Sequence, residues 1–101
     1  MHLVEILLPL RDASGEAFPA AYYDDLAQHL TDTFGGVTSF LRSPAEGRWH
    51  GSRAMQREDI AVMEVMAKTL DRTWWSILKN ELRDKFRQEV LIVRCHSIEL
   101  L

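Results

Sequence analysis

Cysteine is almost absent from this sequence, because Cys95 is the only one among its 101 residues. A single cysteine cannot form a disulfide within the chain, so the disulfide-supported folds of small secreted proteins are excluded. The first segment, MHLVEILLPLRD, also lacks the cationic start and the long apolar stretch of a secretory signal. We therefore expect a cytoplasmic protein.

Long apolar runs and an excess of positive charge are lacking as well. The longest uninterrupted apolar segments are a few residues long, whereas a membrane-spanning helix needs roughly 20 apolar residues. The 12 basic residues are outnumbered by 15 acidic ones, and the formal net charge of -3 provides no general attraction to phosphate backbones or anionic membranes. We expect neither a nucleic acid nor a membrane as partner.

Known cofactor and metal motifs are missing too. The sequence has no glycine-rich phosphate loop, no dinucleotide-binding fingerprint and no Gly-x-Ser-x-Gly turn. The histidines show neither the helical i, i+4 pairing nor the cysteine spacing of zinc sites; they are His2, His29, His50 and His96. We expect no metal and no cofactor.

What the sequence does contain is enough apolar material for one core. Hydrophobic residues make up 47% of the chain and charged residues 27%, as in ordinary globular proteins. A chain of this length is about the size of one domain, so we expect residues 1–101 to form a single domain.

The first half of the sequence predicts a strand, a helix and a second strand. Residues 2–8 are rich in β-branched and leucine side chains and end at Pro9, which cannot continue a central ladder. Pro19 suits the first turn of a helix, and an apolar stripe then recurs at helical spacing until Gly35-Gly36. The stripe consists of Tyr23, Leu26, Ala27, Leu30 and Phe34. Residues 37–42 form the second predicted strand.

A hairpin is predicted after the second strand. The turn sequence SPAEG at residues 43–47 reverses the chain, and RWH at residues 48–50 then returns along residues 37–42 as the second arm. A structureless connection over residues 43–57 would be long for a domain of this size.

The second half repeats the first half's order of elements. Residues 59–67 form a third predicted strand, and Asp71 is the expected N-cap of a helix that extends to residue 88. The apolar stripe of this helix consists of Trp75, Leu78, Leu82 and Phe86. The closing segment, EVLIVRCHSIELL, starts as a fourth strand and allows a bend or bulge between Arg94 and Ser97.

The predicted order, β-α-β-β-α-β, is that of a ferredoxin-like α+β fold. Its four-stranded antiparallel sheet carries both helices on one face, and an extended hairpin joins the second and third strands. If Val4, Ile6 and Leu8 pack under the helices, the alternation of a strand turns Leu3, Glu5 and Leu7 to the other face. By the same phase that face receives Ile60, Val62, Glu64 and Met66 from the third strand and Val90, Ile92, Arg94 and His96 from the fourth.

This uncovered face is too apolar for a single small domain to leave in water. A second copy of the chain, packed sheet against sheet, is the simplest cover. A one-residue bulge in the third or fourth strand would exchange the faces and move Glu64 or Arg94 under the helices.

In size, strand order and apolar sheet face, the sequence resembles the dimeric α+β barrel proteins over nearly its whole length. That group includes small monooxygenases, muconolactone isomerases, haem-degrading enzymes and ligand-sensing domains. The resemblance implies a homodimer, and no short motif of any one branch is present, so it implies no catalytic residue. Tautomerases use an amino-terminal proline as base, whereas His2 stands at that place here, which disfavours that group.

The candidate catalytic residues are Glu5, Glu64 and His96, because strand phase places them on the apolar uncovered face together with Arg94. Two interpretations are open. Glu5 or Glu64 pairs with Arg94 and only sets the register of a dimer, or a carboxylate or His96 acts as general acid or base while Arg94 binds an anionic group of a ligand.

Further ligand-binding candidates lie around the predicted hairpin. They are Arg42, Trp49 and His50. Trp49 is more typical of a structural aromatic, and His50 points to the opposite face if the arm is extended. Outside the hairpin, Trp75 and Cys95 are expected in the core.

Two classes of function follow. The first is a cofactor-free enzyme or ligand-binding homodimer with a small, partly apolar organic ligand on the sheet. The alternative is a structural or regulatory module whose uncovered face serves only for assembly. RNA binding is disfavoured because the sheet positions offer aliphatic side chains and the net charge is negative.

Overall fold

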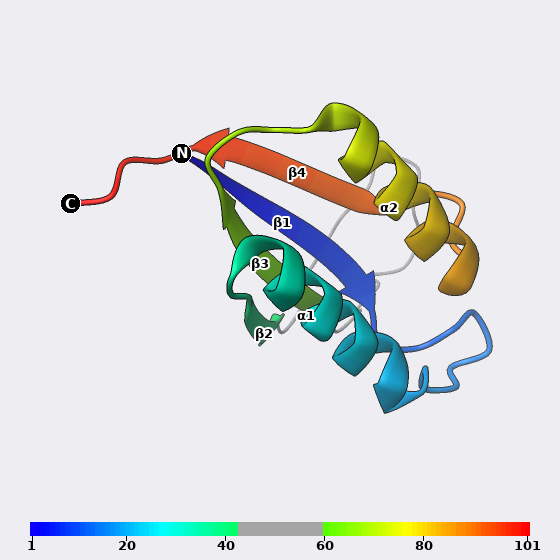
Figure 1. The fold of residues 1–101 in the computed structure, drawn as a ribbon. Coiled ribbons are helices and arrows are strands. Elements are labelled where there is room, and N and C mark those ends of the chain that lie inside the picture. The colour runs from blue at the N-terminus through cyan, green and yellow to red at the C-terminus, as the bar shows by residue number, and fades with distance from the viewer. Residues whose placement is uncertain (43–59) are drawn as a thin grey trace, which may run out of the picture.

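A computed structural model describes residues 1–42 and 60–101 and has the predicted ferredoxin-like α+β architecture (Figure 1). The elements are β1 (His2–Pro9), α1 (Ala20–Phe34), β2 (Thr38–Arg42), β3 (Ile60–Ala67), α2 (Arg72–Lys85) and β4 (Ile92–Ser97). The hairpin arm, with Trp49 and His50, lies outside the described residues. No helix in the described part of the chain is long and apolar enough to cross a membrane.

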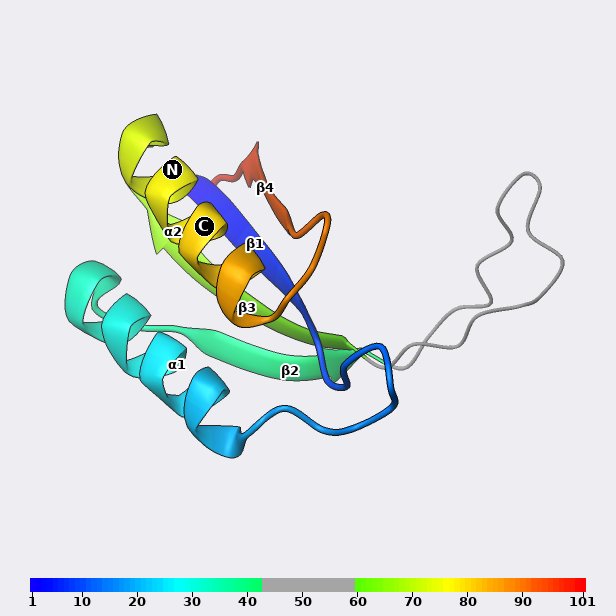
Figure 2. The same ribbon diagram turned by 90° about the vertical axis from the view of Figure 1, so that its right-hand side faces the viewer.

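The four strands form one antiparallel sheet in the order β2-β3-β1-β4. Both helices lie on the same side of this sheet (Figure 2). The pairing of β1 with β3 and with β4 runs without interruption, from His2 opposite Ala67 to Pro9 opposite Ile60 and from His2 opposite Ser97 to Leu7 opposite Ile92. The bend or bulge in the fourth strand is therefore absent from the paired segment, and the predicted faces are confirmed for the paired residues. Val90, expected on the open face, precedes β4 and is not part of the sheet.

The core lies between the helices and the sheet. Ile6 and Leu8 are completely buried on the helix-covered face, where alternate strand residues point toward the helices. The helices contribute Leu26, Leu30, Trp75, Leu78, Leu82 and Phe86, all buried. Trp75 is thus a core residue as predicted. Trp74 packs on α1, where its ring stacks on His29 at a centroid distance of 5.6 Å.

Local signals explain most helix boundaries. The Asp71 carboxylate accepts a hydrogen bond from the Trp74 backbone N–H at 3.1 Å, so Asp71 is the N-cap of α2 as predicted. Gly35 ends α1 in the left-handed conformation at φ 85°, which glycine adopts at no steric cost.

The end of α2 differs from the prediction. The helix stops at Lys85 rather than at residue 88, because Arg87 takes a positive φ of 52° and the Gln88 N–H bonds back to the Arg83 carbonyl at 2.9 Å. This back-bonding is a helix-ending motif that usually employs glycine. A non-glycine residue at that position gives no sequence signal.

The connection between β1 and α1 is organised by Asp12. Its Oδ1 accepts hydrogen bonds from the Ser14 hydroxyl at 2.7 Å and from the Ser14 and Glu16 backbone N–H groups, both at 2.9 Å. The Ser14 hydroxyl is the main cause of a lowered Asp12 pKa, followed by the Glu16 N–H. Arg87 reaches the other carboxylate oxygen at 3.4 Å and connects this loop to the end of α2.

Candidate functional site

The face of the sheet opposite the helices, called the open face below, carries a row of charged side chains. Glu5 on β1 lies directly opposite Glu64 on β3 and opposite Arg94 on β4. Directly opposite residues of an antiparallel pair point to the same side, so these three side chains share the open face. His96 follows Arg94 by two residues on β4 and therefore points to the same face. The structure thus brings together the four candidates that strand phase had grouped.

Glu5 is the centre of this group, which we call the Glu5 cluster: Glu5, Glu64, Arg94 and His96. Arg94 Nε lies 3.6 Å from Glu5 Oε1, and His96 Nδ1 lies 4.0 Å from the same oxygen. The Glu5 side chain is only 10% exposed, whereas those of Arg94 and His96 are 50% and 58% exposed. A buried carboxylate needs such partners, because burial of an unpaired charge is costly.

The exposure of Arg94 and His96 limits what their contacts with Glu5 add to stability. An arginine that is half in water keeps much of its hydration, and pairs of that kind contribute about 1 kcal/mol or less. The same exposure leaves the outer nitrogens of Arg94 accessible to another molecule. Arginine presents five donors in a planar fork that suits carboxylates and phosphates. The Arg94 guanidinium can therefore contact Glu5 and an anionic group of another molecule at the same time.

Glu64 has a different environment. It is half-buried, it lies directly opposite another carboxylate, and no described cation is within ion-pair distance of it. Like charges opposite one another on a sheet repel. A carboxylate in this position is suited to accept a proton or a hydrogen bond from a bound molecule.

Apolar side chains surround the Glu5 cluster. Met66 on β3 is 51% exposed and Ile92 on β4 is 49% exposed. Leu3 and Leu7 on β1 are half-buried between them. Val62 belongs to the same face by register but is fully buried, with Phe40 and Leu7 as its partners on the two sides. The open face is thus mostly apolar with charge concentrated in one place.

The hairpin candidates are placed only in part. Arg42 is the last residue of β2 and lies opposite Ile60 in register, at the far end of the sheet edge from the Glu5 cluster. Trp49 and His50 fall outside the described residues. The structure therefore leaves the proposed contribution of these three residues to a ligand site as a prediction.

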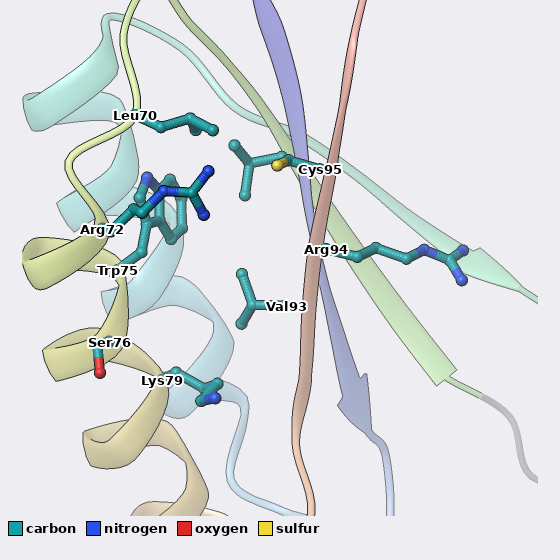
Figure 3. A pocket seen from close by; sticks show the side chains of 9 residues that line it. Leu70, Arg72, Trp75, Ser76, Lys79, Val93, Arg94 and Cys95 are labelled. Carbon is teal, nitrogen blue, oxygen red and sulfur yellow. The ribbon is translucent and has the colours of Figure 1, made fainter.

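The expectation that Cys95 is a core residue is wrong. This residue points to the helix side of β4, as its phase requires, but it is exposed. The reason is that β4 is an edge strand whose residues are almost all exposed, whereas the buried residues of α2 pack on the middle of the sheet. Between α2 and β4 lies a cavity of about 200 Å³, with Cys95 and Val93 on its strand side (Figure 3).

The cavity contains polar residues that the sequence reading had not singled out. They are Arg72, Ser76 and Lys79 of α2. Their spacing of i, i+4 and i+7 places them on one face of the helix, and this signal was available in the sequence. A second hollow, about 420 Å³ and mainly apolar, lies between α1 and β2 next to Tyr23 and Leu41.

No group of three or more His, Cys, Asp or Glu side chains in residues 1–42 and 60–101 is placed to hold a metal ion. The Glu5 cluster has two carboxylates and one imidazole, but the Arg94 guanidinium lies 3.6 Å from Glu5 Oε1. The side chains of the Glu5 cluster are of types that can transfer protons and contact an anion.

Comparison with known proteins supports the fold. No protein-family model matches this chain, and no curated protein matches it. Among solved structures, it is similar to a phage SAM lyase in complex with S-methyl-5'-thioadenosine, with a TM-score of 0.62. The match has 16% sequence identity and covers 95% of this chain and 80% of the other. At this identity the likeness establishes a common fold and leaves function to be argued from the site.

Proposed function

We propose that this protein binds or transforms a small, partly apolar organic molecule on the open face of its sheet, and that it does so as a homodimer. The observation that carries the proposal is the Glu5 cluster: a carboxylate only 10% exposed, a half-exposed guanidinium and a half-exposed imidazole beside it, and a second carboxylate directly opposite. A few convergent polar groups within an apolar surface are the usual composition of a ligand site.

The apolar surroundings of the Glu5 cluster support the proposed homodimer. Met66 and Ile92 each leave about half of their surface in water on this face, and a second copy would cover them with side chains of the same kind. A two-fold interface is self-complementary, so the two Glu5 clusters would then lie in one enclosed space. The chain acts in this proposal as one cytoplasmic domain without a membrane or nucleic-acid partner.

In this proposal the members of the Glu5 cluster have distinct roles. Arg94 contacts an anionic or strongly polar group of the ligand, because its guanidinium is both held by Glu5 and half-exposed. Glu64 or His96 accepts a proton from the ligand or donates one to it. Glu5 positions Arg94 and His96. No cofactor enters this scheme, because general acid–base chemistry needs only groups that the chain supplies.

The ligand class can be narrowed by chemistry. The similar solved structure holds S-methyl-5'-thioadenosine, a molecule with an apolar thioether and a polar nucleoside. A ligand of this type would place its apolar part against Met66 and Ile92 and its polar part at the Glu5 cluster. We therefore propose nucleoside thioethers as the first class to assay.

The test is native mass spectrometry of the purified protein, followed by titration with S-methyl-5'-thioadenosine and SAM. The proposal predicts a dimer that retains or binds one small molecule per chain. Glu64→Gln should weaken binding or turnover about tenfold or more, whereas Glu81→Gln, an exposed change on α2, should leave both unchanged. A dimer in which Glu64→Gln and Glu81→Gln behave alike would favour the alternative, a module whose open face serves only for assembly.

A further inference from the structure

The cavity between α2 and β4 lies on the helix side of the sheet, away from the Glu5 cluster. Its volume is about 200 Å³. Trp75 and Val93 form apolar walls, Arg72 and Lys79 stand on the helix side, and Cys95 lies on the strand side (Figure 3). The Arg94 side chain points away from the cavity, toward the open face. Arg94 is among the residues that line the cavity, but its charged end lies on the other side of the strand and belongs to the open face.

The cavity has a consistent structural origin. Arg72, Ser76 and Lys79 follow one another at i, i+4 and i+7, so one face of α2 presents all three. Val93 and Cys95 are two residues apart on β4 and therefore point to the same side of the sheet. The hollow exists because the buried stripe of α2, which includes Leu78, packs on the middle of the sheet and leaves the edge strand uncovered.

The charge in this cavity has one sign. Its lining contains three cationic residues, Arg72 and Lys79 of α2 and Arg94 of β4, of which Arg94 points away, and no acidic residue. Within residues 1–42 and 60–101, neither Arg72 nor Lys79 forms an ion pair with a carboxylate. Unpaired cations on the wall of a hollow favour an anionic ligand, and an arginine can bind a carboxylate through two parallel hydrogen bonds.

The spacing of the cations indicates the shape of the ligand. Seven residues of α-helix separate Arg72 from Lys79, which puts their Cα atoms about 10 Å apart. Figure 3 shows the two side chains at opposite ends of the cavity, with Val93 between them. A single compact anion would contact one end only. A molecule with an acidic group at each end and a short hydrocarbon middle matches both the charges and the apolar walls.

We propose that the cavity between α2 and β4 is a binding site for a short organic dianion, held at one end by Arg72 and at the other by Lys79. Trp75 and Val93 contact its hydrocarbon middle, and the Ser76 hydroxyl offers a further hydrogen bond along the helix. This site is independent of the proposed site on the open face.

Cys95 gives a direct readout of occupancy. It is the only cysteine in the sequence, it is exposed, and it lines the cavity. The rate at which neutral iodoacetamide alkylates this thiol is measured with adipate, a six-carbon dicarboxylate, with hexanoate, which has one charge, and with uncharged 1,6-hexanediol. Adipate should slow alkylation saturably with a dissociation constant on the order of 0.1–1 mM. Hexanoate should protect at least several-fold more weakly, and hexanediol should not protect.

Single substitutions show which side chains the protection of Cys95 by adipate depends on. Arg72→Gln and Lys79→Gln should each weaken adipate protection about tenfold, while Lys68→Gln, an exposed cation outside the cavity lining, should change nothing. All three positions are exposed, so the variants should keep the melting temperature of the parent. Protection that is absent, equal for adipate and hexanediol, or lost equally in Lys68→Gln would overturn the proposal. Binding of S-methyl-5'-thioadenosine to the open face should be unaffected by Arg72→Gln, so the two proposals fail separately.

Discussion

The two faces of the sheet are built from alternate residues of the same strands, yet they differ in kind. On the helix-covered face Val4, Ile6 and Leu8 are at most 2% exposed. On the open face the neighbours of these residues include a charged group at Glu5, and Met66 remains 51% exposed. The covered face is thus closed by the two helices, whereas the open face leaves apolar side chains such as Met66 half in water among the described residues. The difference indicates that the covered face carries most of the folding energy, and it is the open face to which we assign contacts with other molecules.

The largest loss of stability should come from truncating a residue of the covered face, and a truncation on the open face gives the comparison. Leu8 is fully buried under the helices, so Leu8→Ala should lower the free energy of unfolding by about 2–5 kcal/mol through lost burial and the cavity left behind. Met66→Ala, on the open face, should cost less than about 1 kcal/mol in dilute protein, because half of its surface is already in water. Urea unfolding of both variants measures the contrast. Equal losses would show that the two faces contribute alike to the fold.

The two carboxylates of the open face should respond with opposite sign. Glu5→Gln removes the charge that holds Arg94 and His96 and should destabilise the fold by about 1 kcal/mol, a modest value because both partners are half-exposed. Glu64→Gln removes a like charge directly opposite Glu5 and should stabilise the fold by about 0.2–1 kcal/mol. Chemical denaturation at low ionic strength checks both values, and a loss of stability in Glu64→Gln would mean that this carboxylate has a structural role.

The next largest loss of stability should come from removing the hydrogen bond of the Tyr23 hydroxyl at the edge of the covered face. The Tyr23 hydroxyl donates a hydrogen bond to the Pro9 carbonyl at 2.6 Å. Tyr23→Phe should therefore cost about 0.5–1.5 kcal/mol. Tyr22→Phe is the matched control, since the Tyr22 hydroxyl has no hydrogen bond within the described residues, and it should change the unfolding free energy by less than about 0.5 kcal/mol.

The stability of the fold at alkaline pH gives a second test of the environment of Tyr23. Burial raises the pKa of Tyr23 above its ordinary value of 10.0. The folded state thus favours the protonated phenol, and its contribution is complete below pH 10.0 and is lost as the pH rises through the raised pKa. The stability difference between the parent and Tyr23→Phe should shrink above that pH. A difference that stays constant would contradict the raised pKa of Tyr23.

The smallest expected effect is the loss of stability when acid protonates Asp12 in the loop between β1 and α1. The pKa of Asp12 is lowered from 3.8, first by the Ser14 hydroxyl. The ionised carboxylate therefore stabilises the fold above pH 3.8, and this contribution is lost as the pH falls through the lowered pKa. Asp12→Asn should be slightly less stable than the parent near neutral pH and equal to it at the lowest pH at which both still fold. Thermal unfolding across the acid range measures this convergence, and a gap that widens in acid would contradict it.

Much of the fold could be predicted from the sequence because its signals are local and strong. Pro9 and Gly35 end the first strand and the first helix, Asp71 begins the second helix, and two apolar stripes mark the helix faces. Strand alternation alone placed Glu5, Glu64, Arg94 and His96 on one face, since an uninterrupted register preserves phase across a sheet.

The remaining features depend on three-dimensional context. The exposure of Cys95 follows from which strand lies at the edge and where α2 sits, and neither can be read from the composition of β4. The early end of α2 depends on a positive φ at Arg87, which a non-glycine residue does not signal. Which of the two carboxylates pairs with Arg94 was open in the sequence, and only the strand order makes it Glu5, the direct neighbour of β4.

The central claim is that the open face is completed by a second copy of the chain. Native mass spectrometry of the parent protein and of Met66→Glu tests it most directly, because a charge at this half-exposed position should oppose burial in an interface without disturbing the core. The account predicts twice the chain mass for the parent and the single-chain mass for Met66→Glu, with an unchanged circular dichroism spectrum. A parent protein that has the single-chain mass at micromolar concentration would contradict it.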